Sequence, residues 1–326
     1  MRGGRGDVAG GMALVVTAAA YGGPEVLSVV EEPDREPGPG EARIEVRAAG
    51  VNPVDVKSYS GAFGTDPDRL PIRLGAEAAG VVTAVGPGTT GPAGPVQAGD
   101  EVIVYRAPGA YATELVVPGQ TVIPKPGTLD WPQAAGLMVT GVTAWHLLAA
   151  TDVAAGETVL VHGGSGGVGL MAVQLAGVRG AKVVATASPA RHDLLRDLGA
   201  IPVAYGPGLA GRVTAAAPGG VDAALDLVGT DEAWDVSMGL VADKARVATI
   251  VAFARGLQAG IKVLGGAPGA DPGTEIREGA RLDLARLAQD GKLRVIVSQT
   301  FPFAAAAAAH HAILDGHTTG KIALIP

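Results

Sequence analysis

The sequence has 326 residues, of which 48% are apolar and 17% charged, with a formal net charge of −7 and no cysteine. A chain of this length is expected to form about two domains, and without cysteine it has no disulfides, cysteine nucleophiles or thiolate metal sites. The acidic charge gives no reason to expect nucleic-acid binding, and because no apolar run reaches ~18 residues and no signal-type segment is visible, we expect no membrane span and a cytoplasmic location.

The N-terminal part of the chain has a β-type pattern. Residues 1–11 are rich in glycine and charge, which predicts a flexible extension. From Met12 to about Val122, short runs of valine and isoleucine alternate with proline- and glycine-rich turns, a pattern typical of a barrel-like antiparallel domain. The expected strands are Ala13–Thr17, Ala42–Ala48, Gly80–Val85, Glu101–Val104 and Ala112–Val117.

A helical segment follows this β region. Asp130 is a candidate N-cap, and Pro132 suits an early helical position. Gly136–Ala150 then reads as a helix that carries the chain into a second domain.

The stretch Thr158–Ala176 (TVLVHGGSGGVGLMAVQLA) combines an apolar strand, a glycine-rich turn and a helix. Gly164, Gly166 and Gly169 fit G-x-G-x-x-G in the setting that dinucleotide binding requires. We assign the tight turn to Gly164, the approach of a pyrophosphate to Gly166, and close packing of helix on strand to Gly169. The helix N-terminus would offer its N–H groups to the phosphates. The alternative is an ordinary glycine-rich turn.

From Thr158 to about Gly266, strands and helices alternate, which predicts a doubly wound parallel sheet. Ligands of such sheets bind beyond the carboxyl ends of the strands. The strands expected after the first one are Lys182–Thr186, Val203–Tyr205, Asp222–Leu227, Arg246–Val251 and, as a candidate, Ile261–Leu264. The expected helices include Ala190–Leu198, Leu209–Ala217, Asp231–Leu240, Arg277–Gln289 and Ala304–Leu314.

The second strand of this region carries information about the cofactor. An NAD site usually has Asp or Glu about twenty residues past the glycines, but residues 185–188 are Ala-Thr-Ala-Ser. Thr186, Ser188 and Arg191 could instead hydrogen-bond and neutralise a 2′-phosphate, so we predict NADP(H). Tyr205 could pack beside that phosphate. The alternative is that Ser188 only caps a helix, Arg191 is solvated and Tyr205 is structural.

Several motifs, in order from about Met12 to Pro326, resemble the zinc-free quinone oxidoreductase branch of the medium-chain dehydrogenase/reductase family. They are the glycine turn and AAYGGPEV (19–26), AAGVNPVD (48–55), GAEAAGVV (75–82), GAYATELV (109–116), GVTAWHL (141–147) and GHTTGKIAL (316–324).

The resemblance implies an α/β protein with two domains. Residues 12–138 would form a GroES-like β-barrel catalytic domain, completed by residues 271–326, and residues 139–270 a Rossmann NADP-binding domain. The implied reaction is hydride transfer from NADPH to a small-molecule quinone, in a protein that is often a homodimer. The alternatives are an enoyl or alkenal reductase acting on an α,β-unsaturated carbonyl, and a non-catalytic NADPH-binding protein.

The resemblance also bears on metal binding. Zinc members of the family carry Gly-His-Glu where this chain has Gly75-Ala76-Glu77, and their zinc-binding cysteines are missing here. We therefore predict no metal site. Without a Lewis acid, a conjugated acceptor is suitable because hydride addition spreads charge over the enone or quinone.

Candidate catalytic residues lie in the family's substrate loop. Asn52 and Asp55 match its N-x-x-D motif, and Asn52 could donate to the substrate or to the nicotinamide ribose. The alternative is that both brace their own loop. Lys57 and Tyr59 are candidates for protonating the product oxygen, with solvent as the other proton source. Phe63 stands where relatives often have tyrosine, so a tyrosine acid is not transferred to that position.

Residues expected beside the cofactor come from several segments. The resemblance adds the remainder of the glycine turn and four residues from other parts of the chain. The full set is Thr140, Gly164, Ser165, Gly166, Gly167, Val168, Gly169, Thr186, Ser188, Arg191, Tyr205, Gly229, Phe253 and Lys321.

Overall fold

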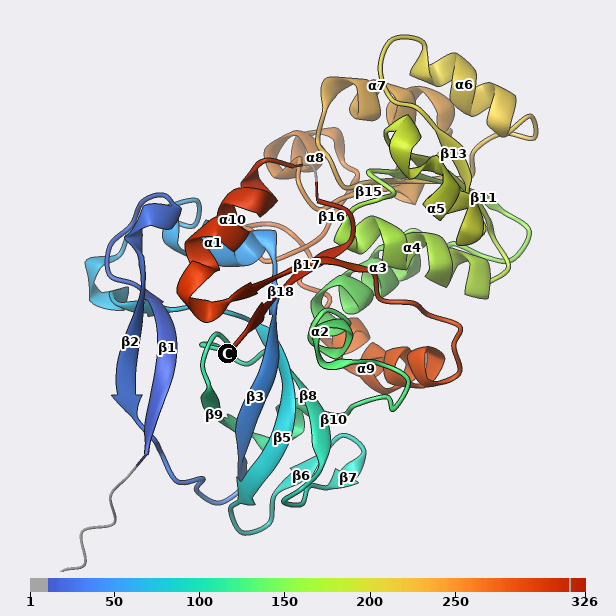
Figure 1. The fold of residues 1–326 in the computed structure, drawn as a ribbon. Helices are drawn as coiled ribbons and strands as arrows, with labels where there is room; N and C mark the ends of the chain where they lie inside the picture. The colour runs from blue at the N-terminus through green and yellow to red at the C-terminus, as the bar shows by residue number, and fades with distance from the viewer. Residues whose placement is uncertain (1–10, 317) are drawn as a thin grey trace, which may run out of the picture. The chain divides into compact units, whose positions relative to one another are not determined.

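The computed structural model describes residues 11–316 and 318–326, which divide into two compact units (Figure 1). The first unit comprises the described residues up to Lys125 together with Gln299–Gly316 and Ile322–Pro326. The second comprises Pro126–Ser298 and residues 318–321. The predicted flexible extension lies outside the described residues except for Gly11, whose carbonyl accepts a hydrogen bond from the Asp34 N–H at 2.9 Å.

These units differ from the expected domain boundaries at two segments. Residues 126–138 and 271–298 belong to the second unit, whereas the sequence placed them in the catalytic domain. The reason is packing: α9 (Thr274–Gln289) lies against α3 (Met138–Ala150), where a Cβ on Gly141 would be only 3.0 Å from the Leu284 side chain. A glycine at this point lets the two helices approach closely.

The first unit consists mainly of antiparallel strands, as the sequence predicted. A three-stranded sheet has the order β2-β1-β4, and a larger sheet has the order β10-β8-β5-β3-β18-β17, with β9 also paired to β3. The bounds are β1 (Met12–Ala18), β2 (Leu27–Pro33), β3 (Glu41–Val51), β4 (Ile72–Arg73), β5 (Glu77–Val85), β8 (Glu101–Tyr105), β9 (Glu114–Pro118), β10 (Val122–Pro124), β17 (Val297–Pro302) and β18 (Lys321–Ile325); β6 (Thr90–Gly91) and β7 (Gly94–Pro95) form a small hairpin.

The end of the chain joins the first unit's sheet. Ile322 lies opposite Val51 in the antiparallel pair of β18 with β3, so residues near the C-terminus form part of this sheet. Two helices accompany it, α1 (Pro53–Tyr59) and α10 (Ala306–Leu314). The buried core contains mostly valine, isoleucine and alanine from alternate strand positions, such as Ile44 and Val46 of β3.

The second unit holds a six-stranded parallel sheet in the order β13-β12-β11-β14-β15-β16. This order is 3-2-1-4-5-6, the arrangement of a Rossmann fold, which confirms the predicted fold class. The strands are β11 (Thr158–His162), β12 (Lys182–Thr186), β13 (Ile201–Val203), β14 (Ala223–Asp226), β15 (Val247–Thr249) and β16 (Lys262–Val263). The helices are α2 (Trp131–Ala135), α3, α4 (Gly167–Val178), α5 (His192–Asp197), α6 (Leu209–Ala216), α7 (Asp231–Leu240), α8 (Phe253–Ala259) and α9.

Two predicted helices differ in their details. The predicted helix Gly136–Ala150 begins two residues later, at Met138, as α3, because α2 precedes it and ends at Ala135 with Gly136 as its C-cap. Asp130 caps α2 as expected, accepting the Gln133 N–H at 2.8 Å. Ser188 makes no capping hydrogen bond, and the chain passes through a 3-10 turn before α5. Within the described part of the chain, no helix is both long and apolar enough to cross a membrane.

Candidate functional site

The glycine-rich turn joins β11 to α4 at the carboxyl edge of the parallel sheet. Gly163, with a φ of 77°, supplies the left-handed backbone of the turn, so the tight turn belongs to Gly163 and not to Gly164 as predicted. Gly164 is required for packing instead, since a Cβ there would lie 2.7 Å from the Cβ of Ala185 on β12.

The other two glycines of the motif lie in different environments. A Cβ on Gly169 would lie 2.2 Å from the Gly163 carbonyl oxygen, so only glycine allows α4 to pack this closely. A Cβ on Gly166 would meet only that same oxygen, at 3.5 Å, which leaves this part of the backbone open. Because α4 begins directly after Gly166 and has no acidic residue in its first turn, the cradle fits a pyrophosphate.

Thr186, at the carboxyl end of β12, supports the turn. Its Oγ1 accepts the Gly163 N–H at 3.0 Å, and its carbonyl accepts the Gly164 N–H at 2.9 Å. The side chain is buried. This position favours a bracing role over the predicted contact with a 2′-phosphate.

The segment at residues 318–321 lies against the same turn. The Gly320 N–H donates to the Ser165 carbonyl at 2.9 Å, and Gly320 forms a β-bridge with Gly166. Lys321 is buried, and its Cδ lies 3.4 Å from where a Cβ on Gly167 would be. The structure thus brings Lys321 next to Ser165 and Gly167, which come more than 150 positions earlier in the sequence.

Thr140 of α3 is also next to the turn. Its methyl group lies 3.0 Å from the position of a Cβ on Gly167, while its hydroxyl donates to the Gly136 carbonyl at 2.9 Å. The predicted cofactor residues Thr140, Gly167 and Lys321 therefore share one neighbourhood, while the Thr140 hydroxyl is bonded to the backbone just before α3.

Ser188 and Tyr205 follow two neighbouring strands at this edge. Thr186 of β12 lies opposite Val203 of β13, and the Ala187 N–H donates to the Val203 carbonyl at 3.1 Å. Each of the two predicted residues comes two positions after this pair, and Tyr205 is 61% exposed. Among the described residues, the side chains of Ser188, Arg191 and Tyr205 make no hydrogen bond or ion pair, so they are available to a ligand.

The loop that carries Tyr205 is held by Arg212 of α6. The guanidinium donates to three backbone carbonyls, those of Ala204 (2.8 Å), Gly206 (2.6 Å) and Pro207 (2.8 Å). The Gly206 N–H donates to Glu232 Oε2 at 2.7 Å. Sequence reasoning missed Arg212, because a lone arginine in a surface helix gives no signal for this contact.

Asp226 organises the loops that carry Gly229 and Phe253. Its Oδ1 accepts the Gly229 N–H at 2.8 Å, and its Oδ2 accepts a hydrogen bond from the Thr249 hydroxyl at 3.0 Å. The Thr249 Oγ1 accepts the Ala252 N–H at 3.0 Å, directly before Phe253 begins α8. These bonds fix both loops at the carboxyl edge of the sheet.

The predicted substrate loop lies in the first unit, at the start of α1. Asn52 and Asp55 are buried, and Asp55 Oδ2 accepts the Asn52 backbone N–H at 2.8 Å. Asn52 Nδ2 donates to the Gly50 carbonyl (3.2 Å) and to Glu77 Oε1 (3.1 Å). Both amide protons are thus engaged within the protein, which favours the bracing interpretation; donation to a substrate would require one of these partners to be exchanged.

Tyr59 faces the interior of the first unit. Its hydroxyl hydrogen-bonds to His310 Nδ1 at 2.8 Å, and His310 Nε2 lies 3.2 Å from the Tyr111 hydroxyl, which donates to Asp55 Oδ2 at 2.9 Å. Burial, with nearby carboxylates, raises the pKa of Tyr59 to about 12. Tyr59 is fully buried, whereas Lys57 is half-exposed. No motif in the sequence indicated Tyr111 and His310 as partners of Tyr59.

Comparison with known proteins identifies the family. An alcohol dehydrogenase GroES-like domain matches residues 38–127, and a zinc-binding dehydrogenase domain matches residues 198–324. A quinone oxidoreductase of Pseudomonas aeruginosa is 34% identical over 97% of this chain and 100% of its own length. The chain belongs to the quinone oxidoreductase branch of the medium-chain dehydrogenase/reductase family. As a member of this family it is an oxidoreductase.

Solved structures of this family share the fold. A mycobacterial protein in complex with NADPH is 31% identical, with a TM-score of 0.82 and coverage of 97% of this chain and 100% of its own. The Escherichia coli quinone oxidoreductase in complex with NADPH is 29% identical, with a TM-score of 0.82 and coverage of 96% and 100%.

One matched family model is described as zinc-binding, so possible metal ligands are relevant. Across residues 11–316 and 318–326, no three or more His, Asp or Glu side chains are placed together to hold a metal ion.

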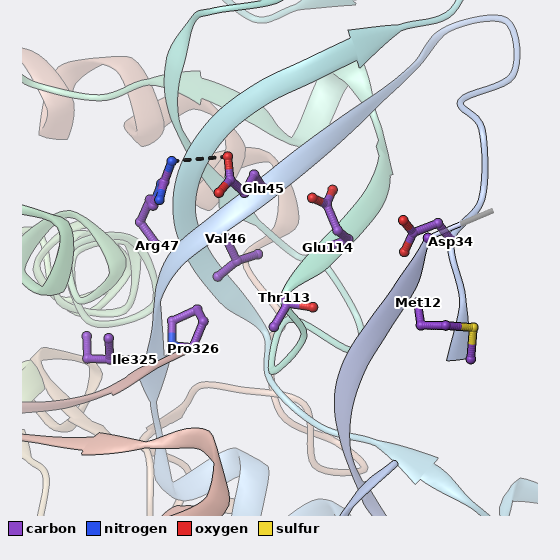
Figure 2. Close-up of a pocket in the computed structure, with 10 residues that line it drawn as sticks. Met12, Asp34, Glu45, Val46, Arg47, Thr113, Glu114, Ile325 and Pro326 are labelled. Atoms are coloured by element: carbon purple, nitrogen blue, oxygen red, sulfur yellow. Dashed lines mark hydrogen bonds and ion pairs between the residues drawn. The ribbon is translucent and has the colours of Figure 1, made fainter. Parts of the chain in front are cut away.

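A cavity of about 430 Å³ lies in the first unit, apart from all the predicted site residues. Figure 2 shows its charged lining, in which Glu45 and Arg47 form an ion pair at 3.1 Å. The lining residues are Gly11, Met12, Asp34, Glu45, Val46, Arg47, Thr113, Glu114, Ile325 and Pro326.

Proposed function

We propose that this protein is an NADPH-dependent reductase that transfers hydride to a quinone. The observation that carries the cofactor part is the group of unpaired polar side chains Ser188, Arg191 and Tyr205 beyond β12 and β13, with no acidic residue among residues 187–192. An arginine and two hydroxyls suit a 2′-phosphate. The NADPH complexes of two family members support this choice.

The cofactor and the acceptor would be served by different residues. NADPH, when bound, supplies the hydride. The open backbone at Gly166 and the N-terminus of α4 would hold the pyrophosphate, because the first N–H groups of a helix have no partner within it. Lys57 would place its ammonium beside the acceptor oxygen, where it would stabilise the developing negative charge and donate a proton.

We also propose a cytoplasmic homodimer. The cytoplasmic location is supported by the absence of cysteine and the dimer by resemblance to the family. Sedimentation analysis that finds a monomer would remove the dimer from this proposal.

The first experiment titrates the purified protein with NADPH and NADH and follows fluorescence. The wild type is expected to bind NADPH more tightly, and Arg191→Ala to lose about tenfold or more in NADPH affinity while NADH affinity changes little. Arg196→Ala is the matched control, since Arg196 follows in α5 and is paired with Asp193. Equal loss in both variants would contradict the 2′-phosphate assignment.

The second experiment measures NADPH oxidation with a series of quinones and identifies the product. A hydroquinone product supports the proposal. Turnover only with enones, giving a saturated carbonyl, would establish the alkenal reductase alternative. Tight NADPH binding without transfer to any acceptor would indicate a non-catalytic binding protein.

A further inference from the structure

Helix α1 has one buried face and one exposed face. Asp55, Val56 and Tyr59 point into the first unit, whereas Val54 is exposed and Lys57 is half-exposed. The buried face of α1 packs against α10, which carries His310. The position of the candidate proton donor Lys57 therefore depends on what holds the buried side of this short helix.

With a neutral His310 ring, the hydrogen bonds on that buried side run in only one direction. The single proton of the Tyr111 hydroxyl is donated to Asp55 Oδ2, so the Tyr111 oxygen must accept from His310 Nε2–H. His310 Nδ1 is then the acceptor of the Tyr59 hydroxyl proton. The result is a chain that leads from Tyr59 through His310 and Tyr111 to Asp55, which in turn caps α1 by accepting the Asn52 N–H.

His310 is suited to remain neutral in this chain. It is fully buried, and burial lowers its pKa to about 4, with the neighbouring His311 adding to the effect. The titratable groups around it are His311 on its own helix, Tyr59 and Asp55 of α1, and Tyr111. Only the neutral ring can donate with one nitrogen and accept with the other, so both tyrosines are satisfied in a single arrangement.

These polar residues do more than fill space, because burying them costs free energy that apolar side chains would not cost. Burying polar groups is unfavourable unless each finds a partner, and an apolar cluster of the same size would avoid the requirement. A satisfied buried network, in contrast, specifies one geometry. Here that geometry ties both ends of α1: Asp55 in its first turn and Tyr59 at its last residue.

We propose that His310 is a positioning residue which, by bridging Tyr59 and Tyr111, fixes helix α1 and thereby presents Lys57 to the acceptor. This inference rests on the proposed reductase function for its kinetic consequence. Its structural consequence, the order of α1, is independent of any acceptor.

The test compares His310→Ala with His311→Ala, the exposed neighbour on the same helix. Hydrogen exchange of the α1 amides, residues 54–60, is expected to accelerate in His310→Ala and to stay at the wild-type level in His311→Ala. With a quinone acceptor, kcat is expected to fall about tenfold in His310→Ala, because small displacements of a reacting group are costly. The Kd for NADPH should not change, since the glycine turn belongs to the second unit.

A conservative variant separates positioning from general destabilisation. His310→Gln keeps one donor and one acceptor and is expected to recover part of both α1 protection and kcat. The double variant Tyr59→Phe/His310→Ala should lose little more α1 protection and kcat than His310→Ala alone, because both changes break the same chain of hydrogen bonds.

The inference is wrong if hydrogen exchange of α1 is unchanged in His310→Ala. It is also wrong if His310→Gln keeps α1 protected but does not restore kcat. If the wild type does not oxidise NADPH with any of the quinones, the proposed function is wrong, independently of the inference about His310. The exchange data then still decide whether His310 holds α1.

Discussion

Arg246 and Glu157 form a bidentate ion pair at the amino ends of the parallel strands. Arg246 Nη1 donates to Glu157 Oε1 at 2.9 Å and Nη2 donates to Oε2 at 2.6 Å, while the Ala154 N–H also donates to Oε2 at 2.8 Å. Glu157 directly precedes β11 and Arg246 directly precedes β15, so the pair spans the intervening strand β14. Both side chains are mostly covered.

This pair predicts a dependence of stability on pH. The hydrogen bond from Arg246 is the main cause that lowers the pKa of Glu157 from 4.5 to about 2. A carboxyl group whose pKa is lower in the folded state stabilises the fold above its unfolded pKa, and this contribution disappears as the pH falls from about 4.5 to about 2. Arg246→Gln is expected to cost about 1 kcal/mol of unfolding free energy at pH 6, and less at pH 3.

Denaturant unfolding at both pH values measures the effect. Arg196→Gln is the control, because its ion pair with Asp193 is exposed and should contribute under about 0.5 kcal/mol. If the cost of Arg246→Gln were as large at pH 3 as at pH 6, the lowered pKa of Glu157 would not be its source.

A second prediction concerns the packing of α4. Gly169→Ala places a methyl group 2.2 Å from the Gly163 carbonyl oxygen, so the turn or the helix must shift, and both Tm and NADPH affinity are expected to fall. Gly177→Ala in the same helix meets no atom within 4 Å and should stabilise the protein by up to about 1 kcal/mol. Calorimetry with and without NADPH compares the two variants; equal Tm values would refute the close-packing argument.

The third prediction concerns Gly166, three residues before Gly169, where a substitution is expected to affect binding but not stability. An added methyl group meets nothing nearer than 3.5 Å, so Gly166→Ala should leave Tm unchanged. The methyl group would, however, stand where a pyrophosphate approaches the backbone, and NADPH affinity is expected to drop about tenfold or more. A variant that binds NADPH normally would show that the phosphates lie elsewhere.

How much the sequence predicts depends on how local the signal is. The doubly wound parallel sheet and the glycine turn were predictable because apolar strands, glycines and helices follow one another within a few residues. The pattern did not show which glycine adopts positive φ. We assigned the tight turn to Gly164, whereas Gly163 has the positive φ in the structure. Spacing alone reports close approach but not backbone dihedral angles.

Long-range partners were not predictable from one sequence. Tyr111 and His310 are 199 positions apart, and nothing in either segment indicates the other. The same is true of Gly141 and Leu284, whose contact places α9 in the second unit and shifts the expected domain boundary. Such contacts depend on tertiary packing, whereas hydrophobic periodicity indicates only local secondary structure.

The last prediction concerns Arg212 and the loop that carries Tyr205. The three carbonyls that Arg212 binds lie within four consecutive residues, so Arg212→Ala removes most of the hydrogen bonds that order this loop. Tyr205 would then pay a larger entropy cost to meet the 2′-phosphate. We expect NADPH affinity to fall about tenfold and NADH affinity to change little, with an intermediate effect in Arg212→Lys, which retains a charge but not the planar fork. Arg286→Ala, which breaks an exposed ion pair on α9, serves as the control in fluorescence titrations. A parallel fall in NADPH and NADH affinity would instead assign Arg212 to general stability of the second unit, because only the 2′-phosphate distinguishes the two nucleotides.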